Sequence, residues 1–217
     1  TIAATHGAYT AFSNITIGKN VVVVDDPSLK GSDYYVVQLD EESFADVADK
    51  VQYDFRPDDI DKYLYIWDDT FTAGSVSGAN YYGRAAGWVS LATKDLGWSG
   101  AGFFLAESYG QVDMTALFNN PDDYYLHVAT KSTDSNAAYE FILNDGVSEV
   151  NVKIGAGEEY DFTKNGEWQS IEIPVTDLNK KGLYFVGPFS DVNIFAFLGG
   201  QNQGDTIELD AIFYYKK

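Results

Sequence analysis

Thr206-Ile-Glu-Leu-Asp-Ala-Ile-Phe-Tyr-Tyr215 is the stretch that decides the fold class, because apolar residues alternate along it with polar ones. A period of two is typical of a β-strand that buries one face, whereas an amphipathic helix has a period near 3.6. We therefore expect alternate side chains to point to opposite faces of a sheet. The predicted core-facing residues are Ile207, Leu209, Ala211 and Phe213, and the predicted outer residues are Glu208, Asp210 and Tyr214.

The same period recurs in short runs separated by Gly, Asn and Asp clusters, which predicts an all-β protein of about eleven strands. The predicted strands are Ile15–Val24, Asp33–Leu39, Tyr63–Trp67, Gly87–Thr93, Gly102–Glu107, Tyr124–Thr130, Tyr139–Leu143, Val150–Ile154, Gln169–Val175, Asn193–Leu198 and Thr206–Tyr215. Such spacing is typical of a sandwich or barrel. Only Glu41–Asp49 is predicted to be helical, with Phe44 and Val47 on one face, so Rossmann and TIM architectures are disfavoured.

Alternation also predicts the faces of two further strands. In one strand the core-facing residues are Tyr124, Leu126 and Val128, and the outward residues are Tyr125, His127 and Lys131. In Tyr63–Trp67 the buried face is accounted for by Leu64 and Ile66. A row of three aromatic side chains is then expected on the opposite face: Tyr63, Tyr65 and Trp67.

The chain has 217 residues and no cysteine. This length is typical of one all-β domain, and neither an internal repeat nor a low-complexity linker is visible, so we expect a single domain over residues 1–217. Residues 1–50 are the least patterned part, where we expect an extra N-terminal hairpin. The absence of cysteine excludes disulfide, zinc–thiolate and iron–sulfur sites as well as a thiol nucleophile.

The charge balance excludes two classes of partner. Thirty-three acidic residues against 14 basic ones give a formal net charge of −19, which repels nucleic acids and anionic membrane surfaces. An aromatic content of 16% excludes a disordered chain despite this charge. Apolar runs stay below the ~18 residues that span a bilayer, so no membrane insertion by this chain itself is expected. Any export signal is expected to have been removed or never to have been present.

Catalytic motifs are weak. The two histidines, His6 and His127, are weak candidates for the base that nucleophilic catalysis requires. The glycine-rich stretch 74–87 precedes a predicted strand, whereas a phosphate-binding loop precedes a helix. Glycoside hydrolysis needs two carboxylates, and residues 208–213 approach a laminarinase-type E-x-D-x-x-E strand. The position that would carry the acid–base residue is Phe213, so the pattern fails at its decisive residue.

Acidic clusters are candidate calcium sites, because Ca²⁺ takes several oxygen ligands from loops. The clusters are Asp25/Asp26, Asp58/Asp59/Asp61, Asp68/Asp69, Asp122/Asp123 and Asp210. None has the D-x-D-x-D-G spacing of a known calcium loop, and a solvated acidic surface is the alternative for each.

Aromatic residues outside any obvious core indicate sugar binding, because pyranose faces stack on Trp and Tyr while polar side chains bind the hydroxyls. Trp98 lies in a glycine-rich turn, and Tyr81 and Tyr82 lie in a long Gly/Ser/Asn loop, although each could instead pack against the sandwich edge. The predicted stacking residues are Trp98, Tyr81, Tyr82 and Trp67. The predicted hydrogen-bonding residues are Asp68, Asp69, Arg84 and Glu107.

Several segments together resemble jelly-roll carbohydrate-binding modules. Gly166-Glu-Trp-Gln-Ser-Ile-Glu-Ile-Pro-Val-Thr-Asp-Leu178 resembles the recurring stretch G-x-W-x-x-I-x-I-P-L-x-D-L of these modules. Phe195–Gly200 followed by Asp205–Tyr215 resembles their closing pair of strands. Val112–Leu117 followed by Asp123–Ala129 resembles their D-x-S-x-L … Y-x-L-H-F-A strand.

Leu64–Gly74, with Trp98–Gly102 after it, is similar to surface glycan-binding lipoproteins of Bacteroidetes polysaccharide-utilisation systems. The resemblance covers residues 55–217. It implies a galactose-binding-domain-like jelly-roll β-sandwich, an extracellular or cell-surface address as an outer-membrane lipoprotein, and a neighbouring domain of a longer protein. It also implies a structural calcium ion, with Asp210 as the ligand that is carried over.

We therefore expect non-catalytic binding of an extracellular, neutral polysaccharide or oligosaccharide through exposed aromatic side chains. One alternative is a glycoside hydrolase or polysaccharide lyase on a jelly-roll scaffold, which would need two carboxylates facing each other in one cleft. Another alternative is a structural or adhesive module that binds a protein, which would show a broad apolar patch without polar groups around it.

Overall fold

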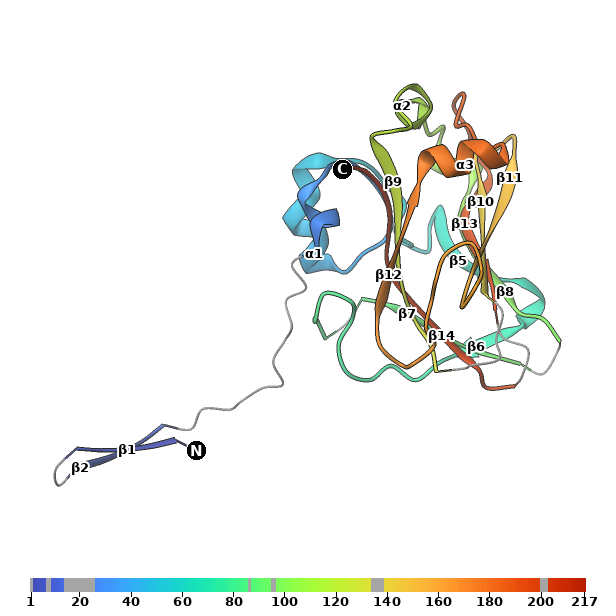
Figure 1. Ribbon diagram of the computed structural model, residues 1–217. Coiled ribbons are helices and arrows are strands. Elements are labelled where there is room, and N and C mark those ends of the chain that lie inside the picture. The colour runs from blue at the N-terminus through green and yellow to red at the C-terminus, as the bar shows by residue number, and fades with distance from the viewer. Residues whose placement is uncertain are drawn as a thin grey trace.

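The alternating runs form strands in two sheets that pack face to face (Figure 1). Every strand predicted from Asp33 onward is present, which confirms the all-β jelly-roll sandwich, whereas the predicted strand Ile15–Val24 lies outside the described residues. In this part of the chain no helix is long and apolar enough to cross a membrane. The computed structural model describes residues 2–6, 9–13, 26–85, 87–94, 97–133, 139–199 and 203–217.

The small sheet has the strand order β11-β10-β13-β8-β5, and all its neighbouring strands are antiparallel. Its strands are β5 (Lys62–Ile66), β8 (Gly100–Leu105), β10 (Tyr139–Asn144), β11 (Glu149–Ile154) and β13 (Val192–Leu198).

The large sheet has the order β12-β9-β14-β3-β4, with β7 pairing to the first half of β14 and β6 pairing to β7. Only the β3–β4 pair of this sheet is parallel in the described part of the chain. Its strands are β3 (Ser32–Gln38), β4 (Val51–Asp54), β6 (Phe71–Ala73), β7 (Val89–Thr93), β9 (Tyr124–Lys131), β12 (Gln169–Pro174) and β14 (Thr206–Lys216). Separately, β1 (Ile2–His6) and β2 (Tyr9–Ser13) form an antiparallel hairpin.

The predicted helix is present as α1 (Glu41–Val47), which Asp40 caps by accepting hydrogen bonds from two backbone N–H groups of its first turn. Two further helices, α2 (Thr115–Asn119) and α3 (Val175–Lys181), were not predicted from the sequence. Val175, predicted as the last residue of a strand, instead begins α3, directly after Pro174, which ends β12 and has no N–H to donate to a ladder. The 3₁₀ turns are η1 (Pro27–Lys30), η2 (Ala48–Lys50), η3 (Trp67–Asp69) and η4 (Glu107–Tyr109).

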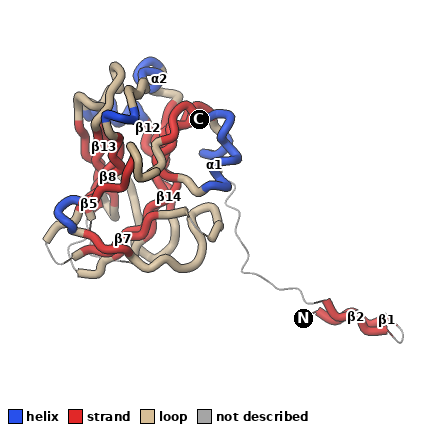
Figure 2. The backbone as a smooth tube through the Cα atoms, turned by 180° about the vertical axis from the view of Figure 1, so that it is seen from behind, coloured by secondary structure: helices blue, strands red, loops and turns tan. Residues whose placement is uncertain are grey.

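The large sheet is apolar on both faces. Its inner face packs against the small sheet, and its outer face is covered by the segment that contains α1 (Figure 1, Figure 2). In this outer cluster Phe213 and Tyr215 of β14 pack with Leu39 and Val47. His127 of β9, predicted to face outward, is fully buried because this segment covers it.

The alternation of β14 reverses at Ala211. This residue has a φ of 49°, and the pairing of β14 with β9 shifts register between Asp210 and Phe213. The bulge turns Ile212 and Tyr214 toward the main core, so the predictions that Ala211 and Phe213 share the face of Leu209 and that Tyr214 faces outward are both wrong.

We predict that Ala211→Val lowers the free energy of unfolding by roughly 2–3 kcal/mol, because a β-branched residue is strained at positive φ and overfills the outer cluster. Ala211→Gly is the control, since glycine accepts this φ and loses only one buried methyl group, with an expected change within about 1 kcal/mol. Urea unfolding measures both variants. Equal losses in the two variants would contradict a conformational role for this position.

Candidate functional site

The outer face of the small sheet has a floor of small residues. Because Ala101 and Phe103 of β8 face the main core, their neighbours Gly100 and Gly102 face outward. Ala196 of β13 pairs with Gly102 and also lies outside the core cluster. These three small residues are themselves buried, because other side chains lie over them.

The two glycines allow other side chains to lie directly on the sheet. A Cβ atom on Gly100 would come within 2.3 Å of the Trp67 ring, and a Cβ atom on Gly102 would come within 2.5 Å of Asn193 Oδ1. The Trp67 ring thus covers Gly100 at the end of β5, and the Asn193 side chain lies beside it on Gly102. Asn193 Oδ1 has no hydrogen-bond partner among the described residues.

Aromatic side chains line the β5 edge of this floor. Tyr65 pairs with Gly102 and its side chain is 53% exposed. Tyr63 pairs with Phe104, and the two rings stack at a centroid separation of 5.8 Å. Leu64 packs against the main core, as its alternation with Tyr63 and Tyr65 predicts.

Trp98 lies at the same end of the sheet as Trp67, and it is 44% exposed. The segment that follows Trp98 is held to the turn that follows Trp67: Ser99 Oγ donates to the Thr70 carbonyl at 3.2 Å, and the Gly100 N–H donates to Thr70 Oγ1 at 3.1 Å. We call Tyr63, Tyr65, Trp67 and Trp98 the aromatic face.

The predicted acidic neighbours have different positions. Asp68 and Asp69 are exposed directly after Trp67, both with positive φ, and Asp69 forms an ion pair with Lys94. Glu107 is exposed beyond the opposite end of β8. The structure therefore places Asp68 and Asp69, but not Glu107, at the Trp67 end of the aromatic face.

Tyr81 and Tyr82 lie in the outer cluster of the large sheet instead, with 8% and 6% of their surface exposed. The Tyr81 hydroxyl donates to Asp26 Oδ2 at 2.8 Å, and the Tyr82 hydroxyl lies 3.3 Å from Ser28 Oγ. Both hydroxyl groups therefore bind the N-terminal segment, and neither tyrosine belongs to the aromatic face.

Arg84 likewise serves this cover. Its guanidinium forms ion pairs with Asp40, the N-cap residue of α1, at 3.4 Å. It also pairs with two residues of α1, Glu42 and, at 3.2 Å, Asp46. The arginine is therefore engaged with the helix on the side of the sandwich away from the aromatic face (Figure 1).

Asp210 is fully buried beneath the loop that carries Tyr81, whose N–H donates to Oδ2 at 2.9 Å. Burial raises the pKa of Asp210 to about 7, and its Oδ1 has no partner among the described residues. A free carboxylate oxygen fits a cation, but the described residues gather no group of three acidic or imidazole ligands there. Calcium at Asp210 stays a prediction.

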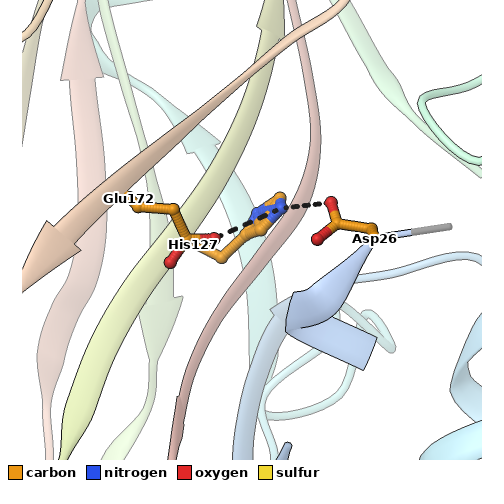
Figure 3. A group of neighbouring side chains, drawn as sticks. All are labelled: Asp26, His127 and Glu172. Carbon is orange, nitrogen blue, oxygen red and sulfur yellow. Dashed lines mark hydrogen bonds and ion pairs between the residues drawn. The ribbon is translucent and has the colours of Figure 1, made fainter. Parts of the chain in front are cut away.

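The described residues contain one group of three such ligands, formed by Asp26, His127 and Glu172 (Figure 3). Burial lowers the pKa of His127 to about 4 and raises the pKa of Glu172 to about 7. These three residues lie on the outer face of the large sheet, whereas the aromatic face belongs to the small sheet. Both sheets therefore separate the two sites.

Sequence reasoning missed the floor and this cluster. The alternation of Gly100 and Gly102 with apolar residues is a signal for a flat outer face, and it is visible once β8 is recognised. No comparable signal joins Asp26, His127 and Glu172, because they are far apart in the chain.

Residues 62–216 match the family described as Carbohydrate binding domain 30, from the first residue of β5 to the last residue of β14. A solved Family 30 carbohydrate-binding module is 18% identical, with 71% of this chain and 87% of that chain covered and a TM-score of 0.45. The Family 11 module of a cellulosomal cellulase of Clostridium thermocellum is 14% identical, with 73% and 89% covered and a TM-score of 0.43. No curated protein matches the chain.

We predict that the buried carboxyl of Asp210 makes stability fall as pH rises in chelator-containing buffer. Its folded pKa of about 7 lies above the unfolded value, so the folded state holds the extra proton between about pH 4 and pH 7. The stabilising contribution is complete below about pH 4 and is lost as the pH approaches 7. Asp210→Asn removes this titration, so urea unfolding should show a flatter pH profile than the wild type.

Asp122→Asn is the matched control, because Asp122 is exposed and forms no ion pair with the described residues, so it measures the effect of removing one surface carboxylate. Glu172 titrates in the same direction, so the measured quantity is the difference between the profiles of the wild type and Asp210→Asn. Parallel profiles for these two proteins would contradict the raised pKa of Asp210.

Proposed function

Since the chain belongs to the carbohydrate binding domain 30 family, we propose that it binds a neutral extracellular polysaccharide on the aromatic face without cleaving it. The observation that carries this proposal is the pair of exposed rings at the β5–β8 edge of the small sheet, Tyr65 on β5 and Trp98 just before β8. A large apolar ring left half exposed at the edge of a flat surface is suited to contact a ligand.

The face offers the two kinds of contact that a sugar chain needs. The rings of Tyr65, Trp67 and Trp98 present apolar surface to the C–H faces of pyranose units. The small residues of the floor, which are themselves buried, let the Trp67 ring lie directly against the sheet. The exposed carboxylate of Asp68 supplies acceptors for hydroxyl groups.

The position of the titratable acids supports binding without cleavage. A glycosidase needs a carboxylic acid with a raised pKa beside the scissile bond and a second carboxylate across from it. Among the described residues, the acids whose pKa is raised are Glu172 and Asp210, and both belong to the large sheet. Both lie away from the aromatic face.

A neutral ligand fits the charges better than an acidic one. The chain carries a net charge of −19, which repels an anionic polysaccharide. Arg84 is bound to the acidic residues at α1, and Lys94 is paired with Asp69. A polysaccharide ligand places the domain outside the cell, and an outer-membrane lipoprotein with a neighbouring domain remains part of this proposal.

We predict that Tyr65→Ala and Trp98→Ala each weaken polysaccharide binding by roughly fivefold to thirtyfold, equivalent to about 1–2 kcal/mol per lost stacking contact. Because both rings are exposed, the melting temperature should change by no more than about 1–2 °C. Affinity gel electrophoresis against a panel of neutral polysaccharides, followed by calorimetry with the best ligand, measures both variants.

Tyr184→Ala is the matched control, because Tyr184 is 43% exposed but follows α3, outside the strands of the aromatic face. It should leave affinity unchanged. Wild-type migration that no polysaccharide retards, or equal retardation of all three variants, would overturn the proposed face. Release of reducing ends from a bound polysaccharide would overturn the non-catalytic part of the proposal.

A further inference from the structure

Three side chains from distant parts of the sequence converge in the outer cluster of the large sheet (Figure 3). His127 comes from β9 and Glu172 from β12, where the two residues are paired across the strands. Asp26 is the N-cap residue of η1, at the start of the segment that covers the sheet. The convergence therefore joins the cover to two neighbouring strands.

The distances are close to those of a metal-ligand set. His127 Nε2 lies 3.2 Å from Asp26 Oδ2 and 4.0 Å from Glu172 Oε1, and the three ligand atoms all lie within 4.8 Å of one another. Ligands at ~2.0–2.2 Å from a zinc ion are roughly 3.0–3.5 Å apart. A small inward movement of Glu172, whose side chain is 30% exposed, would complete this spacing.

Neighbouring donors orient both carboxylates. The Ser28 N–H donates to Asp26 Oδ1 at 2.8 Å, and the Tyr215 hydroxyl donates to Glu172 Oε2 at 2.9 Å. The remaining oxygen of each carboxylate, Oδ2 of Asp26 and Oε1 of Glu172, is thereby directed toward His127. Hydrogen bonds of this kind orient metal ligands in proteins, where partners outside the coordination sphere fix the ligand geometry.

The negative charge of this cluster lacks a basic partner. In the described part of the chain, neither Asp26 nor Glu172 forms an ion pair with a lysine or arginine. The Lys217 ammonium group acts on His127 and Glu172 from further away, and it lies over the Tyr125 ring at 4.5 Å. A divalent cation would neutralise the negative charge of two carboxylates that lie so close to a fully buried imidazole.

We propose that Asp26 Oδ2, His127 Nε2 and Glu172 Oε1 bind a divalent transition-metal ion of the zinc type. An imidazole with two carboxylates suits such an ion, whereas calcium takes six to eight oxygen ligands. The Tyr81 hydroxyl, 2.8 Å from Asp26 Oδ2, borders the site. This site is distinct from the predicted calcium ligand Asp210.

The bound ion would stabilise the fold by tying the N-terminal cover to the sheet. Because the ligands come from three segments, the ion binds the folded chain in preference to the unfolded one. At a zinc concentration ~100 times the dissociation constant, we expect the melting temperature of the chelator-treated protein to rise by about 5–10 °C.

The test titrates chelator-treated full-length protein with zinc chloride alone, and follows melting temperature and calorimetric heat. Glu172→Gln keeps the size of the side chain and the Tyr215 contact but weakens the ligand, so it should lose most of the zinc-dependent shift. His127→Gln should lose it as well. The matched control is Glu167→Gln, an exposed position five residues before Glu172, which should respond to zinc like the wild type.

A cobalt(II) titration adds a readout that stability does not influence, since an imidazole–carboxylate site gives a visible d–d absorption that Glu172→Gln should abolish. If His127→Gln fails to fold, the proposal is tested by the zinc-dependent shift of Glu172→Gln and by the cobalt spectrum. An unshifted wild type, an equal zinc shift in Glu172→Gln, or displacement of the ion by millimolar calcium would overturn the proposal.

Discussion

The structure depends on one constraint: the large sheet is apolar on both faces, so both faces must be covered. The small sheet covers the inner face, and residues 26–50 together with the Tyr81–Tyr82 turn cover the outer face. The φ of 49° at Ala211 makes this double burial possible, because it redirects Phe213 and Tyr215 to the outer cluster while Ile212 and Tyr214 fill the main core. In a regular strand, each of these four side chains would lie on the opposite face of the sheet.

This constraint also determines which surface is available to a ligand. With the outer face of the large sheet covered, the exposed rings of Tyr65 and Trp98 lie on the opposite side of the sandwich, at the small sheet. Its glycines would weaken an ordinary strand, since glycine has no side chain to pack. Here they let the Trp67 ring and the Asn193 side chain lie directly on the backbone of β8.

Much of the fold could be predicted from the sequence, because a period of two depends on local alternation alone. The residues of the site were harder. Trp67 and Trp98 were predicted from their poor fit to a core, and Asp68 and Asp69 as hydrogen-bonding neighbours of the stacking rings. The structure places all four at one end of the small sheet. The same reasoning placed Tyr81 and Tyr82 in an exposed loop, because alternation does not reveal that a remote segment covers it.

His127 shows the same limit from the opposite direction. Alternation correctly gives the face of β9 on which it lies, but the exposure of that face depends on residues 26–50, which are remote in sequence. A histidine predicted to be on the surface is therefore fully buried between two carboxylates. Its distance from the aromatic face, with both sheets in between, implies that a metal ion there would act on stability and leave sugar affinity unchanged, since sites without shared contacts contribute independently. We therefore propose separate roles for the two sides of the sandwich, with the covered side stabilising the fold and the aromatic face binding the ligand.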